Sequence, residues 1–148
     1  MRYFLDTSAL VKIYHREEGS DQVIEIYERE EVVISELSTV EFLSAVYRKF
    51  REGEISERAL RAVCDKFDED LQVRYTLFPF TSFVVEEARY LMRRYGGSRS
   101  LRTLDSLQLA FFLVYCDRSE DMFVCADRRL LDVARAEGVR VIDLTGDR

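Results

Sequence analysis

Four acidic residues stand where a carboxylate could do chemistry. Asp6 and Asp127 each close a short apolar run, Asp105 lies in a segment that is apolar nearly all round, and Glu41 lies near the start of a predicted helix. A buried carboxylate without a partner is costly, so it pairs, becomes protonated or binds a metal ion. Because oxygen ligands suit Mg²⁺ or Mn²⁺ better than Zn²⁺, the four acids predict a site for a hard divalent cation.

Each acid also has a purely structural interpretation. Asp6 and Asp127 could cap the helices that follow them, Asp105 could interact with a helix dipole, and Glu41 could close an S-x-x-E capping box that begins at Ser38. Two carboxylates about 5 Å apart, however, repel by roughly 3 kcal/mol at an effective dielectric near 20. Stability alone would therefore not gather four of them, whereas a bound divalent cation reverses the sign of that interaction.

The elements that must position these acids follow from the hydrophobic pattern. Strands are predicted at residues 2–6, 31–35, 75–80, 122–126 and 139–143, and helices at 8–17, 21–29, 39–52, 57–71, 83–95, 104–116 and 128–137. Alternating strands and helices predict an α/β fold with a parallel sheet covered on both faces. Ligand sites in such sheets lie beyond the carboxyl ends of the strands. Asp6 and Asp127 end strands, and Glu41 and Asp105 are expected to begin helices, so all four should meet at that edge.

Composition narrows the class of protein. The 148 residues, 47% of them hydrophobic, predict one domain spanning residues 1–148. No apolar run approaches the ~18 residues of a membrane span, and three cysteines without a CxxC pair predict a reduced, cytoplasmic protein. The single histidine, His15, excludes a zinc site with two histidines within the chain, and any Ser-His-Asp triad would have to use it.

Several arginines flank the acids. Arg99 and Arg102 precede Asp105, and Arg128 follows Asp127. The net charge of −6 argues against general electrostatic binding of nucleic acid, but arginines beside an acidic centre could hold phosphates. A solvated loop face is the alternative. Carboxylate-held metal ions are well suited to hydrolysis of phosphodiester bonds, which needs no histidine or covalent nucleophile.

These segments resemble PIN-domain proteins, and most closely the small ribonuclease toxins of the VapBC type. The resemblance rests on YFLDTSALVK at 3–12, STVEFLSA at 38–45, LRTLDSLQLA at 101–110 and VCADRRLL at 124–131. It implies a three-layer α/β/α sandwich with a central, mostly parallel sheet. It also implies Mg²⁺ or Mn²⁺ held by Asp6, Glu41, Asp105 and Asp127, cleavage of RNA, a homodimer, and a cognate antitoxin protein. In this interpretation Asp6 and Asp105 are the main metal ligands, Asp127 supports a second metal, and Glu41 orients the attacking water or holds metal through water.

One position departs from the family pattern. The family often has Thr or Ser two residues before the fourth acid, where this chain has Cys125, and a thiol is a poorer hydrogen-bond partner. Two alternatives stay open: a non-catalytic interaction domain that kept the fold, and a phosphatase that forms an aspartyl-phosphate. The phosphatase would require a second Asp two residues after Asp6, where Ser8 stands.

Overall fold

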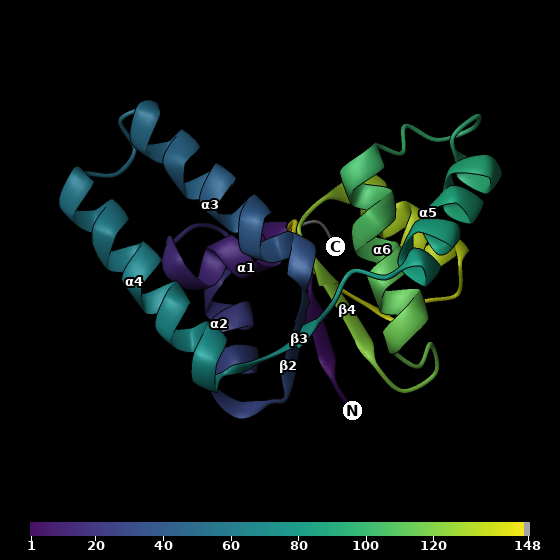
Figure 1. Cartoon of the computed structure of the whole chain (residues 1–148), viewed down its shortest axis with the longest axis horizontal. Helices are drawn as coiled ribbons and strands as arrows, with labels where there is room; N and C mark the ends of the chain where they lie inside the picture. Colours follow the sequence, from purple (N-terminus) through teal and green to yellow (C-terminus); the bar gives the residue numbers. More distant parts are fainter. Residues whose placement is uncertain (147–148) are drawn as a thin grey trace.

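The central element of the computed structural model, which describes residues 1–146, is a parallel sheet of five strands (Figure 1). The strands are β1 (Tyr3–Leu5), β2 (Val32–Ser35), β3 (Tyr75–Phe78), β4 (Met122–Cys125) and β5 (Val141–Asp143). Their order is β3-β2-β1-β4-β5, and every pairing is parallel. The prediction of an α/β fold with a parallel sheet is confirmed.

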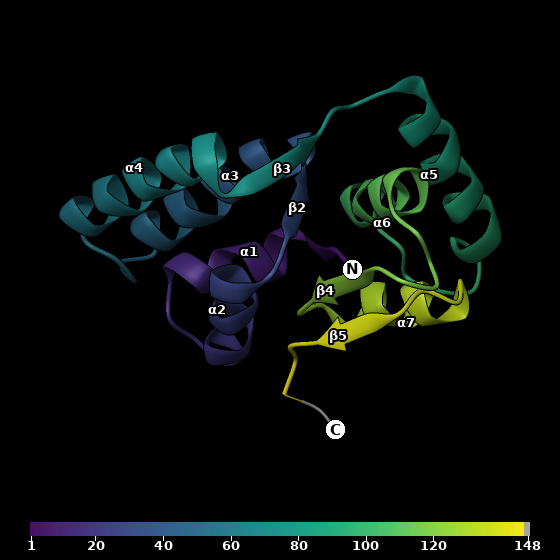
Figure 2. The ribbon, with the colours of Figure 1, turned by 90° about the horizontal axis from the view of Figure 1, so that it is seen from below.

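Seven helices in the described part of the chain cover the sheet. They are α1 (Thr7–Tyr14), α2 (Ser20–Arg29), α3 (Glu36–Arg51), α4 (Glu57–Val73), α5 (Ser82–Tyr95), α6 (Thr103–Tyr115) and α7 (Arg128–Ala136). Figures 1 and 2 show α1 to α4 together on one side of the sheet and α5 to α7 on the other. Successive strand residues point to opposite faces, so Phe4 belongs to the core under α5 to α7, and Leu5 to the core under α1 to α4. The molecule is therefore a three-layer α/β/α sandwich.

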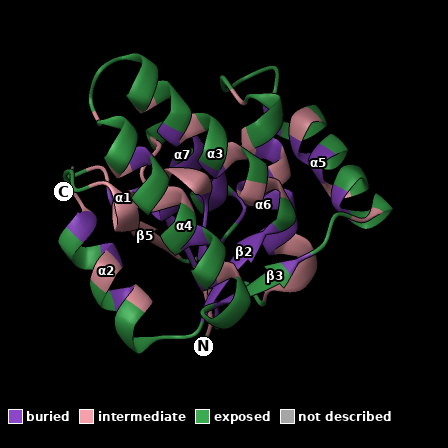
Figure 3. Cartoon of the chain, turned by 60° about the vertical axis from the view of Figure 1, so that its left-hand side comes forward, coloured by how far each residue is buried: buried purple, intermediate pink, exposed green. Residues whose placement is uncertain are grey.

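Helix α6 is the most deeply buried of the helices. Residues 108–112 are buried without interruption, as its nearly all-round apolar sequence predicts. In Figure 3 the buried colour follows β2 and the inner faces of α5 and α6, whereas the outer face of α4 is largely exposed. Helix α6 therefore offers a rigid base for the residues at its first turn.

The order of the strands creates a crevice at one edge of the sheet. The chain steps outward from β1 to β2 and β3, and then returns to place β4 on the other side of β1. In open α/β sheets, ligands bind at such a switch point, outside the carboxyl ends of the strands. Asp6 directly follows β1 and Asp127 follows β4 by two residues, so both lie at this crevice.

Most element ends differ from the prediction by one to three residues, and two of these differences have a clear physical reason. Helix α3 begins at Glu36 rather than at residue 39, and its N-cap is Ser35, whose Oγ accepts from the Ser38 amide at 3.1 Å. The capping box of Ser38 and Glu41 is therefore wrong, and Glu41 lies in the second turn rather than at the helix start. Strand β3 ends at Phe78 rather than at residue 80, because Pro79 has no N–H to donate. No helix within residues 1–146 has the length and apolar character that crossing a membrane requires.

Candidate functional site

Asp6 is the buried centre of the acidic edge. Its side chain caps α1: Oδ1 accepts from the Ala9 amide at 3.1 Å and from Ser8 Oγ at 2.7 Å. Cys125 Sγ donates to Oδ2 at 3.4 Å. Burial raises the pKa of this carboxyl from 3.8 to about 7, and the charge of Asp105 adds to the rise, against the lowering effect of the hydrogen bonds. Near neutral pH, Asp6 is therefore a group that a proton or a cation would stabilise.

Asp105 and Asp127 lie beside each other and share one counter-ion. Burial raises the pKa of Asp105, and the charges of Asp127 and Glu41 raise it further, while Arg102 lowers it. Arg102 Nε lies 3.3 Å from Asp105 Oδ2, and its Nη2 lies 3.3 Å from Asp127 Oδ2. Asp127 also caps α7, accepting two backbone amides at 2.9 and 3.1 Å. Asp127 therefore caps α7 through Oδ1, while its Oδ2 is left to accept from Arg102.

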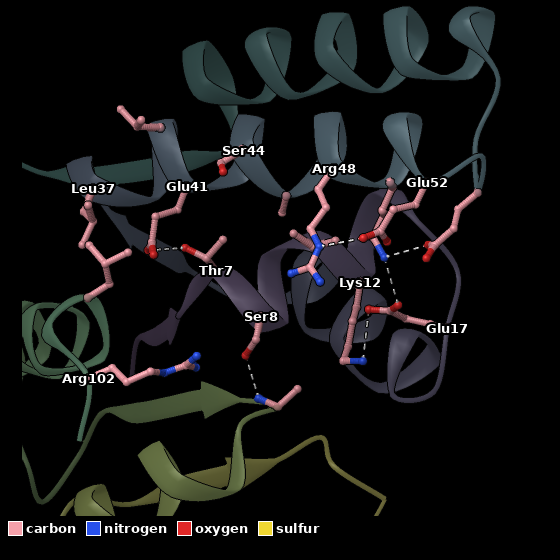
Figure 4. Close-up of a pocket in the computed structure, with 17 residues that line it drawn as sticks. Thr7, Ser8, Lys12, Glu17, Leu37, Glu41, Ser44, Arg48, Glu52 and Arg102 are labelled. Carbon is pink, nitrogen blue, oxygen red and sulfur yellow. Dashed lines mark hydrogen bonds and ion pairs between the residues drawn. The ribbon is translucent and has the colours of Figure 1, made fainter. Parts of the chain in front are cut away.

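Glu41 is held by neutral donors from two other elements. Its Oε1 accepts from Thr7 Oγ1 at 2.9 Å and from Gln108 Nε2 at 2.7 Å. Figure 4 shows the Glu41 and Thr7 side chains pointing toward each other across the gap between α3 and α1. Because the contacts come from α1 and α6, the Glu41 carboxylate is brought to the edge that Asp6 and Asp105 occupy.

The structure thus brings all four predicted acids to one edge of the sheet. The charge of Asp105 raises the pKa of Asp6, and the charges of Asp127 and Glu41 raise the pKa of Asp105. Within residues 1–146, no three Asp, Glu, His or Cys side chains stand close enough together to enclose a metal ion. The donor chemistry, carboxylate oxygens only, fits Mg²⁺ or Mn²⁺. A cation at this edge would replace Arg102 as the partner of Asp105 and Asp127.

A cleft of about 830 Å³ opens beside these acids, with Thr7, Ser8, Glu41 and Arg102 in its wall. It continues between α1 and α3, where Figure 4 shows Lys12, Arg48 and Glu52 at the far end. The basic residues there are paired with acids: Lys12 with Glu17 at 3.2 Å, Arg48 with Glu52 at 3.1 Å, and Lys49 with Glu54 at 3.4 Å. The cleft therefore carries cationic groups along its length as well as carboxylates.

The three predicted phosphate-binding arginines are placed differently. Arg102 lines the cleft and contacts two of the acids. Arg99 lies over the Tyr95 ring, with its guanidinium carbon 5.7 Å from the ring centre, and Arg128 is the first residue of α7, next to Asp127. Arg102 alone of the three is in the wall of the cleft.

Sequence reasoning missed two groups of side chains at the site. The cationic residues of the cleft, Lys12, Arg48 and Lys49, carried no signal, because they belong to ordinary amphipathic helix faces. Gln108 did carry one: it is an amide inside the nearly all-apolar run of α6. A buried amide needs partners, and its partners turn out to include Glu41.

The Cys125 thiol lies between two of the acids. Besides donating to Asp6, its Sγ accepts from the Asp127 amide at 3.3 Å, and burial raises the pKa of the thiol, so it stays neutral. Ser8, where the phosphatase alternative requires a second Asp, donates to Asp6 and accepts from the Ala126 amide at 2.9 Å. That hydroxyl links the start of α1 to the residue that follows β4.

Comparison with known proteins places the sequence of this chain in a family. The sequence model of the PIN domain matches residues 3–136. No curated protein sequence matches the chain. Among solved structures, FitAcB from Neisseria gonorrhoeae superposes with a TM-score of 0.70 and 14% identity over 98% of this chain and 99% of that one.

Two further structures are similar. VapC20 of Mycobacterium tuberculosis, a toxin that cleaves the sarcin-ricin loop, gives a TM-score of 0.67 at 15% identity over 88% of this chain and 93% of that one. A toxin–antitoxin complex from Klebsiella pneumoniae gives 0.65 at 14% identity over 95% of each chain. At these identities, the likeness shows the fold.

Proposed function

The chain belongs to the PIN domain family, and on that premise we propose that it is a Mg²⁺- or Mn²⁺-dependent ribonuclease that hydrolyses RNA phosphodiester bonds. The observation that carries the proposal is the convergence of Asp6, Glu41, Asp105 and Asp127 at the switch point of the sheet, with Asp105 electrostatically coupled to the other three. Such a gathering of carboxylates is unfavourable by itself, and a divalent cation would stabilise it. A non-catalytic domain would have no need to keep it.

The acids would have distinct roles. Asp6 and Asp105 would be the main metal ligands, and Asp127, with Oδ2 facing the site, would support a second metal. A bound metal ion would lower the pKa of water, orient the phosphate and stabilise the leaving oxygen. Both hydrogen bonds to Glu41 end on Oε1, so we assign Oε2 to orient the attacking water.

We propose that RNA approaches along the cleft between α1 and α3. Arg102, in the cleft wall, would turn from the carboxylates to a phosphate once a cation takes its place, since guanidinium groups bind phosphate well. Arg99 and Arg128 would contact phosphates at the rim. One neighbour in fold is a toxin that cleaves the sarcin-ricin loop, and this supports RNA as the substrate.

A nuclease assay tests the proposal. Purified chain is incubated with single-stranded and structured RNA in Mn²⁺ or Mg²⁺, with and without EDTA, beside the Asp6→Asn protein. We expect cleavage by the wild-type chain with metal, and none with EDTA or with the variant. Cleavage that persists in EDTA, or in Asp6→Asn at the wild-type rate, would contradict the proposal. A folded chain that neither cleaves RNA nor binds Mn²⁺ would instead be a non-catalytic interaction domain.

We also propose a homodimer and an antitoxin partner. A toxin–antitoxin complex is among the neighbours in fold, and α3 presents an exposed apolar stripe of Val40, Leu43, Tyr47 and Phe50. Light scattering on the purified chain tests the dimer, and Tyr47→Glu should weaken it. Co-expression with the protein encoded by the neighbouring gene tests the antitoxin, and a stable complex that blocks RNA cleavage is expected. A monomeric chain would contradict the homodimer, and failure of the neighbouring gene's product to bind it would contradict the antitoxin.

A further inference from the structure

Gln108 is a buried amide in an apolar environment. Its side chain lies on α6, three residues after Asp105, and the residue is 2% exposed. Leu107 and Leu109 flank it in the sequence, and Leu109 is fully buried in the core beneath α6. A leucine or methionine at this position would be the ordinary solution for a core helix, because burying an amide costs free energy unless its atoms are hydrogen-bonded.

The amide is engaged at both ends. Oε1 accepts from Ser35 Oγ at 3.0 Å, while Nε2 lies 2.9 Å from Ser38 Oγ and 3.1 Å from Thr7 Oγ1. Its shortest contact, 2.7 Å, is with Oε1 of Glu41. An ionised carboxylate only accepts, so the nitrogen end must face Glu41, and the orientation of the amide is fixed by chemistry. The contact to the charged group is also the strongest of the set.

The network joins the two halves of the molecule. Gln108 projects from α6, which packs in the core with α5 and α7, whereas Glu41, Ser38 and Thr7 belong to α3 and α1, on the other core. Asp105 is on the same helix as Gln108, one turn earlier. A hydrogen bond from Gln108 to Glu41 therefore sets the distance between the Glu41 carboxylate and Asp105.

We propose that Gln108 is a positioning residue of the nuclease site, which fixes Glu41 relative to Asp105 across the seam between the two cores. This inference rests on the proposed function, because it assigns Gln108 a role in that same reaction. It contacts Glu41, the carboxylate that would orient the water or hold the metal through water, and it acts only through Glu41. Thr7, which also donates to Glu41 Oε1 at 2.9 Å, supports the carboxylate from the β1 side but cannot fix it along the direction of α6.

The test combines a matched substitution with a double-mutant cycle. Gln108→Met keeps the volume and removes the donor, and Gln72→Met, on the exposed end of α4, is the control for the same chemical change. With RNA and Mn²⁺, Gln108→Met should lower kcat by about 10-fold or more with KM nearly unchanged, and weaken Mn²⁺ binding in calorimetry by a similar factor. In a Glu41→Gln background, the same substitution should cause no further loss, because its route of action is gone.

The outcomes separate this inference from the proposed function. Wild-type kcat and Mn²⁺ affinity in Gln108→Met, or a full independent loss in the Glu41→Gln background, would overturn the role of Gln108 while leaving the nuclease intact. A wild-type chain that neither binds Mn²⁺ nor cleaves RNA would overturn both. If Gln108→Met does not fold, Gln108→Asn, which keeps the amide but shortens its reach, takes its place in the same measurements with the same expected losses.

Discussion

The two sides of the acidic edge are built in different ways. On one side, Glu41 is held by neutral donors, Thr7 and Gln108, in a largely buried network that spans α1, α3 and α6. On the other, Asp105 and Asp127 share Arg102, whose side chain is 66% exposed. A buried network fixes geometry, because each member would be costly to leave unpaired, whereas an exposed ion pair contributes about 0–1 kcal/mol and yields to salt. The fold therefore sets the position of Glu41 and leaves Asp105 and Asp127 free to change partners.

Removing one of the two carboxylates that pair with Arg102 should give the largest effect on RNA cleavage. Asp105→Asn should reduce RNA cleavage by at least about 100-fold, since the substitution removes a proposed metal ligand and the charge coupled to the other three acids. In EDTA the variant should be at least as stable to heat as the wild-type protein, because the folded state raises the pKa of Asp105 and so disfavours its charge. Asp132→Asn on the exposed face of α7 is the control. Cleavage by Asp105→Asn at the control's rate would show that this side does not take part.

Asp6, buried between the two sides, predicts a pH dependence of stability. Its pKa is raised from 3.8 to about 7 in the folded protein, so the folded state holds this proton more tightly than the unfolded chain does. The stability that it contributes is full below pH 4 and is lost as pH rises to 7. Relative to Asp6→Asn, the wild-type protein in EDTA should lose about 2 to 3 kcal/mol of unfolding free energy between pH 5 and pH 8.

Urea denaturation of both proteins at the two pH values measures that difference. Asn caps a helix as well as Asp does, so the comparison isolates the charge. A difference between the two proteins that does not change with pH would mean that Asp6 is ionised throughout and that its burial is compensated by other groups.

Removing Arg102, which pairs with Asp105 and Asp127, should have a smaller effect and should strengthen rather than weaken metal binding. Arg102→Ala frees Asp105 and Asp127, so Mn²⁺ affinity by calorimetry should rise by up to about 5-fold, while the KM for RNA should increase. Arg99→Ala, away from the carboxylates, should leave Mn²⁺ affinity unchanged. If Arg102→Ala instead weakened Mn²⁺ binding, Arg102 would be supporting the carboxylates rather than competing for them.

The fold and the placement of the four acids at one edge of the sheet were predictable from the sequence, because each rests on a local signal. Apolar runs located all five strands; Asp6 directly follows β1, and Asp127 follows β4 by two residues. The residue at which α3 begins was not predictable, because Ser35 and Ser38 are both good N-cap residues. Ser35 is the N-cap in the structure, and Ser38 instead joins the buried network with Gln108. The ion pair of Arg102 with Asp127 was also not predictable, since the two residues are 25 positions apart in the sequence.

We propose that the four acids hold a divalent cation at the switch point of the sheet. The most direct test of this proposal is an anomalous difference map from crystals of the chain grown in Mn²⁺. We predict a manganese peak coordinated by Asp6 and Asp105, with Arg102 turned away from both Asp105 and Asp127. A map in which Arg102 still bridges Asp105 and Asp127, and manganese is absent from this edge or bound elsewhere, would contradict the account.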